Sequence, residues 1–409
     1  MTRFDARMSR RTFTQATAAV SAGIATGIPA GRAVLAQEAS PVAGAAPGLP
    51  EGAIVVADGL VNPRFIVISE EGTLYVTENG SGGDEVVTPP AGQPGATPVA
   101  SEGTPAASEA PPAEAITRGT TGQITQVTSD GTQSVLASGL LSYSVGVGPV
   151  GLAMGTGELF FSIGGAAVGA GFAPAPEENT VNRVNLESGE VSLIADLGAY
   201  EVENNPDGTD VNPNLYEIAL DVDGRLLVND AGGNTVYSVD PTSGQFELRA
   251  VIPAAGQLPG GESLSGDDAA RQAVPTAIAL GDGVAFIGLL SEGWPQGAPS
   301  VLTLAADGSL SAVASGLAML VGLTTGPDGH LYGSQLFGAP DASGMPGPGS
   351  VVRIYGDGTL EPVLENLPTP HGTAFDVAGN MYIAINSLAM GPGAPAGQVI
   401  RVDGVAAAG

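Results

Sequence analysis

Carboxylate and carboxamide side chains stand at recurring positions in this chain, and their oxygens are the atoms that bind hard cations and activate water. Six short apolar segments end at equivalent positions, which are Glu78, Ile163, Asp230, Leu289, Gln335 and Ile385. Six segments that precede them begin at another set, which is Arg64, Val150, Tyr216, Thr276, Val321 and His371, with Glu217 one place on. Positions that differ while their apolar neighbours recur are typical of a binding site at the centre of a ring. Ordinary variation at solvated loop ends is the alternative.

Two kinds of chemistry are open to these residues. A divalent ion held by oxygen ligands would polarise a carbonyl and activate water, as in a lactonase or esterase. The oxygen candidates for that site are Glu78, Glu217, Asp230, Asn234 and Asn386. His371 is a candidate general base beside Glu78, Glu217 or Asp230, although a single histidine is more often a hydrogen-bonding residue of the core.

A second group of oxygen ligands lies in residues 198–214, which are unusually polar for this chain. Ca²⁺ takes six to eight oxygens in a flexible site, and the candidate ligands are Asn205, Asp207, Asp210 and Asn212. Their spacing does not match an EF-hand loop. The alternative is a loop in which Asn and Asp side chains bind their own backbone.

Several classes of chemistry are excluded by composition. The chain has no cysteine, and all of its 13 basic residues are arginine. Disulfides, thiolate metal sites, cysteine nucleophiles and lysine-based catalysis are therefore absent. With two histidines, a multi-histidine metal centre is excluded as well.

The elements that must position these residues are short strands in a repeating order. Ser134–Leu140 carries the phrase SVLASGL, and related forms recur at 193–197, 312–317 and 362–367, with a further copy near the N-terminus at 54–60. Each unit holds three further strands, often with an Asp-Gly turn after the first. The pattern predicts an all-β, six-bladed β-propeller with four-stranded blades. The strand at 54–60 is expected to complete the last blade beside 398–402.

The connections between these strands vary greatly. Residues 84–118 are rich in Pro, Ala, Gly and Glu, which predicts a disordered insertion. Residues 37–52 have the composition of a disordered tether, 53–404 would form the propeller, and 405–409 would be a tail.

The N-terminal 36 residues predict export. Ser9-Arg10-Arg11-Thr12-Phe13 precedes a weakly apolar stretch from Ala16 to Ala30 and a small-residue cleavage site at Val34-Leu35-Ala36, as in a twin-arginine signal peptide. An uncleaved membrane anchor is the alternative. No other segment is apolar enough to span a bilayer, so we expect a soluble monomer in the periplasm, at the cell surface or outside the cell.

Charge limits the partners. Residues 37–409 carry 8 arginines and 41 acidic residues, a net charge of −33. Such a surface repels phosphate backbones and anionic lipid, so no nucleic-acid partner is expected. Solubility in a cation-rich exterior explains this charge most simply, and cation binding is the alternative.

Specific stretches also resemble a known family. They are Gly59-Leu60-Val61-Asn62-Pro63-Arg64, Asn204-Asn205-Pro206-Asp207-Gly208, and Asn229-Asp230-Ala231-Gly232-Gly233-Asn234. Over residues 53–403 the chain is similar to the ScyD/ScyE family of exported six-bladed propellers, which are related to NHL-repeat and gluconolactonase-like proteins. The resemblance implies a protein that binds a small molecule or a protein partner without established catalysis. The alternatives are a lactonase or esterase dependent on Ca²⁺ or another divalent ion, and a passive scaffold.

Overall fold

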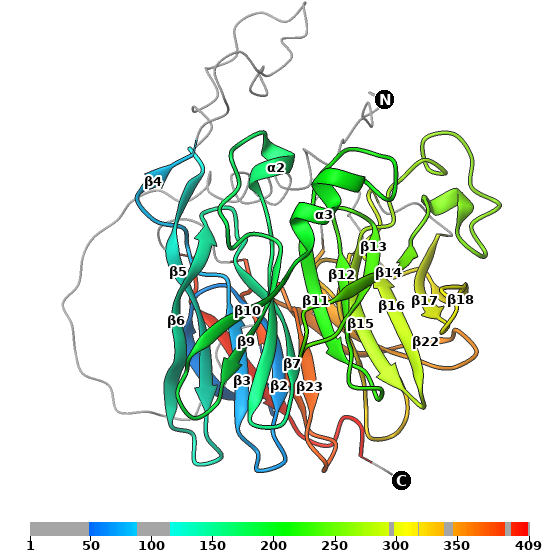
Figure 1. The fold of residues 1–409 in the computed structure, drawn as a ribbon. Helices are drawn as coiled ribbons and strands as arrows, with labels where there is room; N and C mark the ends of the chain where they lie inside the picture. Colours follow the sequence, from blue (N-terminus) through cyan, green and yellow to red (C-terminus); the bar gives the residue numbers. More distant parts are fainter. Residues whose placement is uncertain are drawn as a thin grey trace, which may run out of the picture.

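The computed structural model describes residues 49–87, 115–293, 298–317, 319–338, 347–388 and 394–407. The strands of this part of the chain form six antiparallel sheets arranged as blades around a central axis (Figure 1). The predicted all-β, six-bladed propeller with four-stranded blades is therefore confirmed. The signal peptide predicted at 1–36 and most of the predicted tether lie outside the described residues.

Each blade begins with an inner strand at the axis and proceeds outward through four strands, and blade 1 has in addition the two-residue strand Glu85–Val86, which pairs with the start of its third strand. The strands of blades 1 to 3 are β2 (Pro63–Ile68), β3 (Leu74–Glu78), β4 (Glu85–Val86), β5 (Thr117–Val127) and β6 (Gln133–Tyr143); β7 (Pro149–Met154), β8 (Glu158–Ile163), β9 (Thr180–Asn185) and β10 (Val191–Asp196); and β11 (Leu215–Leu220), β12 (Leu226–Asp230), β13 (Thr235–Val239) and β14 (Phe246–Val251). Those of blades 4 to 6 are β15 (Pro275–Gly281), β16 (Val284–Leu289), β17 (Pro299–Leu304) and β18 (Leu310–Ser315); β19 (Leu320–Thr325), β20 (Leu331–Gln335), β21 (Gly349–Ile354) and β22 (Leu360–Leu367); and β23 (Thr373–Phe375), β24 (Met381–Ile385), β25 (Gly397–Val402) and β1 (Ile54–Leu60).

Three short helical segments accompany the sheets, which are α2 (Ala167–Ala170), α3 (Leu197–Asn204) and η1 (Ala255–Gln257). α2, α3 and β4 lie on one face of the ring, at the top of Figure 1. We call this the upper face. The inner strands begin near this face, since α3 lies in the connection that leads from β10 to the inner strand β11, and α2 follows the end of the second strand β8, which is antiparallel to its inner strand.

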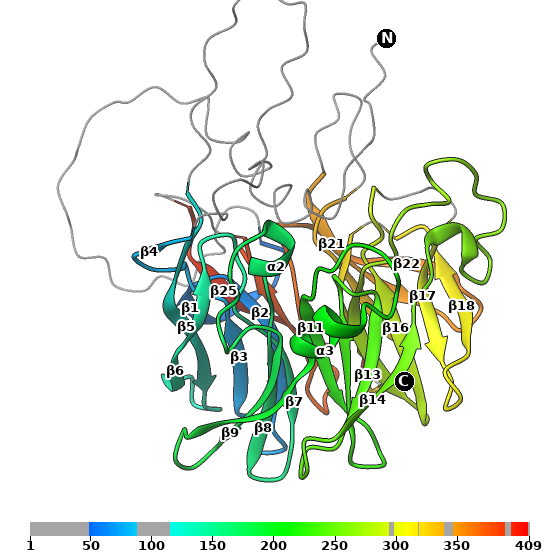
Figure 2. The same cartoon turned by 45° about the horizontal axis from the view of Figure 1, so that its top comes forward.

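The inner strands form a closed circle of contacts, in the order β2, β7, β11, β15, β19, β23 and back to β2. The approach of the last blade to the first is close, because a Cβ added to Gly372 would lie 2.6 Å from Phe65 Cα. In blade 6, β1 pairs antiparallel with β25 through Ile54 with Arg401 and Val55 with Ile400, and Figure 2 shows the two strands together. The first and last strands of the ring therefore belong to one sheet.

The core lies between the faces of consecutive blades. One cluster joins Phe160 and Val181 of blade 2 to Ile218 and Tyr237 of blade 3. Another joins Leu60 of blade 6 to residues of blade 1, including Val76. Alternating apolar residues supply these faces, which is why the period of two in the sequence identified the strands.

Tight turns join the inner strand of each blade to the next strand. Asp282 and Gly283 both have positive φ, 50° and 75°, as a two-residue type I′ turn requires. This turn gives blade 4 its register, in which Gly281 pairs with Val284.

The insertion in blade 1 is ordered at both ends, which corrects the predicted interval. β4 pairs with β5 through Glu85 with Arg118 and Val86 with Thr117, so residues 84–87 and 115–118 of the predicted disordered segment are part of the structure. The bidentate contact of Arg118 with Glu85 supports this pairing. Residues 88–114 lie outside the described residues.

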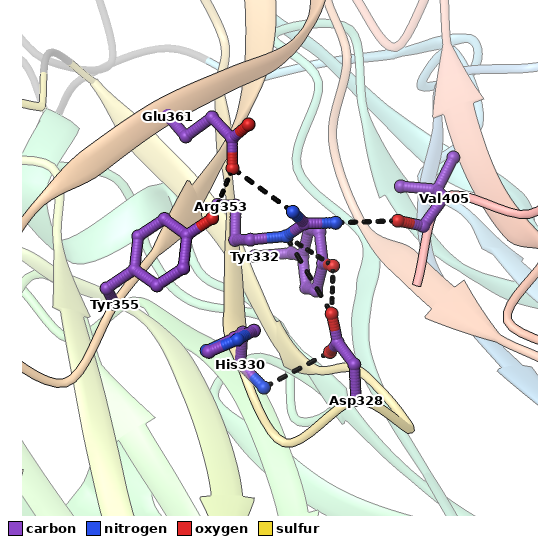
Figure 3. Close-up of polar contacts among 7 residues, drawn as sticks. All are labelled: Asp328, His330, Tyr332, Arg353, Tyr355, Glu361 and Val405. Carbon is purple, nitrogen blue, oxygen red and sulfur yellow. Dashed lines mark hydrogen bonds and ion pairs between the residues drawn. The ribbon is translucent and has the colours of Figure 1, made fainter. Parts of the chain in front are cut away.

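Arginines on the third strands connect neighbouring blades on the lower face. Arg353 on β21 donates to Val405 O at 2.7 Å and to Tyr332 OH at 2.7 Å, while Tyr332 OH donates to Asp328 Oδ2 at 2.7 Å (Figure 3). Arg183 donates in the same manner to Pro241 O. The segment predicted as a tail is therefore bound at its start, where Ala406 is buried.

No helix in the described part of the chain has the length and apolar character needed to cross a bilayer.

Candidate functional site

An irregularity near the start of the inner strand in blades 1 to 5 presents side chains to the axis. In blade 1, Pro63 pairs with Glu78 and Ile66 with Val76, so Arg64 and Phe65 together face Thr77. Blade 3 repeats this with Tyr216 and Glu217, between the pairs Leu215 with Asp230 and Ile218 with Val228. Such two-against-one bulges redirect side chains. In blades 1 to 5 the equivalent positions that the repeats predicted are thus the ones where the blade departs from regular pairing, and in blade 6 His371 lies just before β23.

Tyr216 and His371 meet across the axis. The Tyr216 hydroxyl and His371 Nε2 are 2.8 Å apart, and their rings are stacked at 24° with centroids 5.7 Å apart. Blades 3 and 6 are opposite in the order of inner strands, so this hydrogen bond spans the centre of the ring. The edge-on ring of Phe65 contacts both, with centroids 5.0 Å from His371 and 6.1 Å from Tyr216. These three rings form an aromatic layer at the centre of the ring of blades.

Arg64 lies beside this layer and is buried, with 4% of its surface exposed. Its Nη2 donates to Gly146 O at 2.8 Å, and none of the ion pairs among the described residues involves Arg64. Burial lowers the pKa of Arg64, and the nearby Tyr216 opposes this shift. Since a guanidinium has five N–H donors and remains charged, Arg64 presents a buried positive charge with N–H donors beyond the one that binds Gly146 O.

His371 is buried and is held neutral. Burial, and then the charge of Arg64, lower its pKa well below the usual range. His371 Nδ1 is buried and has no hydrogen-bond partner among the described residues. Burial raises the pKa of the Tyr216 hydroxyl, so Arg64 carries the formal charge of this group at neutral pH.

Glu217 follows Tyr216 but engages the next blade. Its Oε2 accepts a hydrogen bond from Ile278 N of β15 at 2.5 Å. Burial raises the pKa of this carboxyl well above its usual range, against the effect of that hydrogen bond. Glu217 is thus brought to the ring of inner strands, without being brought to His371.

The other predicted carboxylates and amides organise backbone. Glu78 accepts from Val61 N at 2.6 Å, Gln123 Nε2 at 2.8 Å and Thr125 Oγ1 at 2.5 Å. Asp230 Oδ1 accepts from the backbone N–H groups of Asn214, Gly232 and Gly233 at 2.8 to 3.0 Å. The proposed pairing of His371 with a carboxylate as general base is therefore corrected, because its ring contacts Tyr216 and Phe65.

Asn234 and Asn386 also bind neighbouring segments. Asn234 Nδ2 donates to Asp207 Oδ2 at 2.6 Å and to Gln272 Oε1 at 2.9 Å, while its Oδ1 accepts from Val274 N at 3.0 Å. Asn386 Nδ2 donates to Ala396 O at 3.1 Å. Both amides position the loops at the upper face.

The candidate calcium ligands after α3 form an Asx-type turn. Asn205 ends the helix with φ 41° and its Nδ2 donates to Thr209 O at 2.6 Å, while Asp207 Oδ1 accepts from Thr209 N at 2.9 Å. Asp210 is exposed, and Asn212 is buried against Gly169 and Gly232. Within the described ranges, no three His, Asp or Glu side chains gather as a metal would require.

Strained residues lie before three inner strands, a feature that no sequence pattern had indicated: two immediately precede β15 and β19, and the third lies four residues before β23. Val274, Met319 and Thr369 have φ values of 53°, 42° and 38°, a left-handed conformation that costs non-glycine residues about 1 to 3 kcal/mol each. Asn62 holds the same place and conformation in blade 1, where an Asn is tolerated. Comparing the residue before each inner strand would have shown Val and Met at a position suited to Asn or Gly.

The sequence analysis also missed Phe65, since it is apolar and stands beside Arg64, the charged residue that marked its repeat.

An apolar cluster adjoins the same site at the upper face. We call it the mouth cluster, defined by Val274, Met319, Val321, Phe337 and Leu388, of which Val274 and Val321 are buried and the other three are half-buried. Tyr216 packs against it, so this residue links the aromatic layer to the mouth cluster.

No family model matches this chain, and no curated protein matches its sequence. Among solved structures, it is similar to an oxidoreductase of Thermus thermophilus described as a glucose dehydrogenase (13% identity, TM-score 0.50, 86% of this chain and 99% of that chain). It is also similar to the luciferin-regenerating enzyme (12% identity, TM-score 0.50, 88% and 97%) and to a gluconolactonase of Xanthomonas campestris (13% identity, TM-score 0.49, 85% and 88%). At these identities the similarity concerns the fold: this chain has the β-propeller architecture of the first two proteins.

Proposed function

We propose that this protein binds a small anionic molecule, of carboxylate type, at the upper end of its central channel. The observation that carries the proposal is Arg64, a buried arginine without an acidic partner among the described residues. A buried charge is normally paired, and a carboxylate matches the planar fork of a guanidinium. In a chain of net charge −29, acidic side chains are plentiful, yet none of the described ones is paired with Arg64.

The neighbouring groups favour the same ligand. His371 Nδ1 provides a further buried polar atom without a partner among the described residues, and Tyr216 lies within the field of Arg64. The tautomer with hydrogen on Nδ1 would donate to a ligand oxygen while Nε2 accepts from Tyr216. The site thus offers one cation and neutral donors.

The alternative is a divalent-metal lactonase or esterase of the gluconolactonase-like type. It needs several oxygen ligands converging on the channel, and its candidate carboxylates Glu78, Glu217 and Asp230 accept backbone N–H groups instead. The positive charge of Arg64 would repel a metal ion at the aromatic layer. The donor set near this layer therefore fits an anion better than a metal.

Export by the twin-arginine pathway and membership of the ScyD/ScyE family are part of this proposal. They rest on the N-terminal motif and on the stretches around Asn205 and Asp230. A binding protein outside the cytoplasm accords with the family resemblance.

Thermal unfolding with hexanoate, hexylamine and CaCl₂ tests the function. We expect hexanoate to raise the melting temperature in a saturable manner, hexylamine to have no effect, and EDTA to leave the hexanoate effect intact. Stabilisation by CaCl₂, with hexanoate binding abolished by EDTA, would favour the metal-dependent alternative and contradict the proposal.

A further inference from the structure

The mouth cluster adjoins the charged site directly. Val321 stands at the axis-facing position of blade 5, and Val274 and Met319 precede the inner strands of blades 4 and 5. Phe337 and Leu388 follow the second strands of blades 5 and 6 and are half-buried, as is Met319. Blades 5 and 6 thus supply the half-buried apolar residues of the mouth cluster, Val274 of blade 4 packs beneath them, and blade 1 supplies Arg64.

Two apolar members of this cluster have a backbone conformation that their residue types disfavour. Val274 and Met319 have φ values of 53° and 42°, and β-branched or bulky residues rarely adopt this conformation. Hydrogen bonds hold them there, from Leu290 N to Val274 O at 2.9 Å and from Leu336 N to Met319 O at 3.0 Å. Gly or Asn would relieve the strain, so the apolar side chain itself is the feature that distinguishes these positions.

Tyr216 connects the two halves of the site. Its hydroxyl bonds His371 beside Arg64, and its ring packs on the mouth cluster and retains an exposed fraction. A molecule with its anionic end at Arg64 would therefore place its other end over Tyr216 and the mouth cluster.

From this arrangement we infer that the ligand is an amphipathic carboxylic acid, whose carboxylate pairs with Arg64 and whose apolar body lies on Met319, Phe337 and Leu388, the half-buried residues of the mouth cluster. This inference rests on the proposed function, and it adds the chemical class of the ligand's body. An apolar patch beside a buried cation favours molecules that carry both features.

Isothermal titration with acetate, hexanoate and decanoate measures the apolar contribution. Each added methylene buried on the cluster strengthens binding, so decanoate is expected to bind at least about tenfold more tightly than hexanoate, and acetate the most weakly. Decyltrimethylammonium, with an equal chain and a positive head, should not bind. Equal affinity for acetate and decanoate would overturn the inference and leave the proposed function standing, whereas absence of binding by all three acids would overturn both.

The Met319→Gly variant separates ligand contact from structure. Glycine accepts a positive φ, so the free protein should unfold at the same temperature or higher, while decanoate affinity falls about tenfold and acetate affinity is unchanged. Asp282→Gly is the matched control, since it relieves a φ of 50° in a turn distant from the mouth and should leave decanoate affinity unchanged.

Unchanged decanoate affinity in Met319→Gly, or equal loss in Asp282→Gly, would overturn the inference. If Met319→Gly fails to fold, Phe337→Ser replaces it, with the same loss expected for decanoate and the same contrary result.

Discussion

The Tyr216 hydroxyl on blade 3 and His371 Nε2 on blade 6 are 2.8 Å apart, although 155 positions separate these residues in the chain. The bond spans the axis of the propeller and joins opposite blades. Arg64 of blade 1 lies close enough to influence the pKa of both groups. Blades 1, 3 and 6 therefore meet at one polar group in the centre of the ring.

Removing the Tyr216 hydroxyl should destabilise the fold. In Tyr216→Phe, both ring nitrogens of the buried His371 lack a partner, and an unsatisfied buried group costs about 1 to 3 kcal/mol. Tyr355→Phe is the control, because its hydroxyl bonds the exposed Glu361 and its loss should cost less than about 1 kcal/mol. Denaturant unfolding measures both, and equal losses in the two variants would refute the structural role of the Tyr216 bond.

His371 should make stability fall in acid. Its folded-state pKa lies well below the usual value, so below about pH 6.5 the unfolded chain binds a proton that the native protein does not. The stability of the wild type relative to His371→Gln should therefore decline as pH is lowered from 7.5 to 5, by at most about 1.4 kcal/mol per pH unit. A constant difference across this range would contradict a neutral, buried His371.

Glu217→Gln should stabilise the protein at alkaline pH. A carboxyl whose folded pKa is raised favours folding in its protonated form, and this advantage is lost as pH rises through that pKa. The substituted carboxamide retains an oxygen for Ile278 N without a charge. The variant is expected to melt higher than the wild type at pH 8 and to approach it near pH 4, and the opposite order at pH 8 would show that Glu217 is stabilised as a carboxylate.

Arg353 should contribute more than an ordinary surface arginine. It connects Val405 O, Tyr332 OH and Glu361, so Arg353→Met should cost about 1 to 3 kcal/mol. Arg401→Met removes a local contact with the exposed Asp403 and should cost at most about 1 kcal/mol. Combined with Arg353→Met, truncation after Gly404 should cost less stability than it costs in the wild type, because both changes remove the Val405 contact. If the two losses of stability are fully additive, the Val405 contact is unimportant.

Two deletions address the ring. Loss of residues 53–60 removes β1 from β25 and exposes the edge of blade 6, so we expect loss of cooperative unfolding and a tendency to aggregate. Deletion of 88–114 leaves β4 and β5 intact and should change stability by about 1 kcal/mol or less. Calorimetry on both proteins provides the comparison, and similar melting of the two would contradict the dependence on β1.

The repeat in the sequence was sufficient to predict the fold and the axis-facing positions, because alternation and recurrence report strands and their equivalence. Arg64, Tyr216 and His371 were recognised for that reason. Their mutual contacts were not foreseeable, since they depend on which blades are opposite and on how each bulge turns its side chains. Phe65 escaped notice because its role comes entirely from that geometry.

The sequence also did not show how the carboxylates are oriented. Glu78 and Asp230 stand at equivalent ends of second strands, yet each binds backbone N–H groups of the connection to its own blade's inner strand. The polar run after α3 closes on Thr209. Composition identifies the side-chain oxygens but not the backbone N–H groups that donate hydrogen bonds to them. The strain at Val274 and Met319 is likewise visible only in the backbone angles.

Hexanoate affinity of Arg64→Met, measured by isothermal titration beside the wild type and Arg249→Met, tests the central proposal most directly. Arg249 is a half-buried residue on the outer strand of blade 3 that donates to Ala305 O at 3.4 Å, so its variant controls for loss of one positive charge. We predict at least about a tenfold loss for Arg64→Met, since hydrogen bonds to charged groups contribute about 1.5 to 3 kcal/mol, and unchanged affinity for Arg249→Met. Equal affinity in all three proteins would contradict an anion site at Arg64.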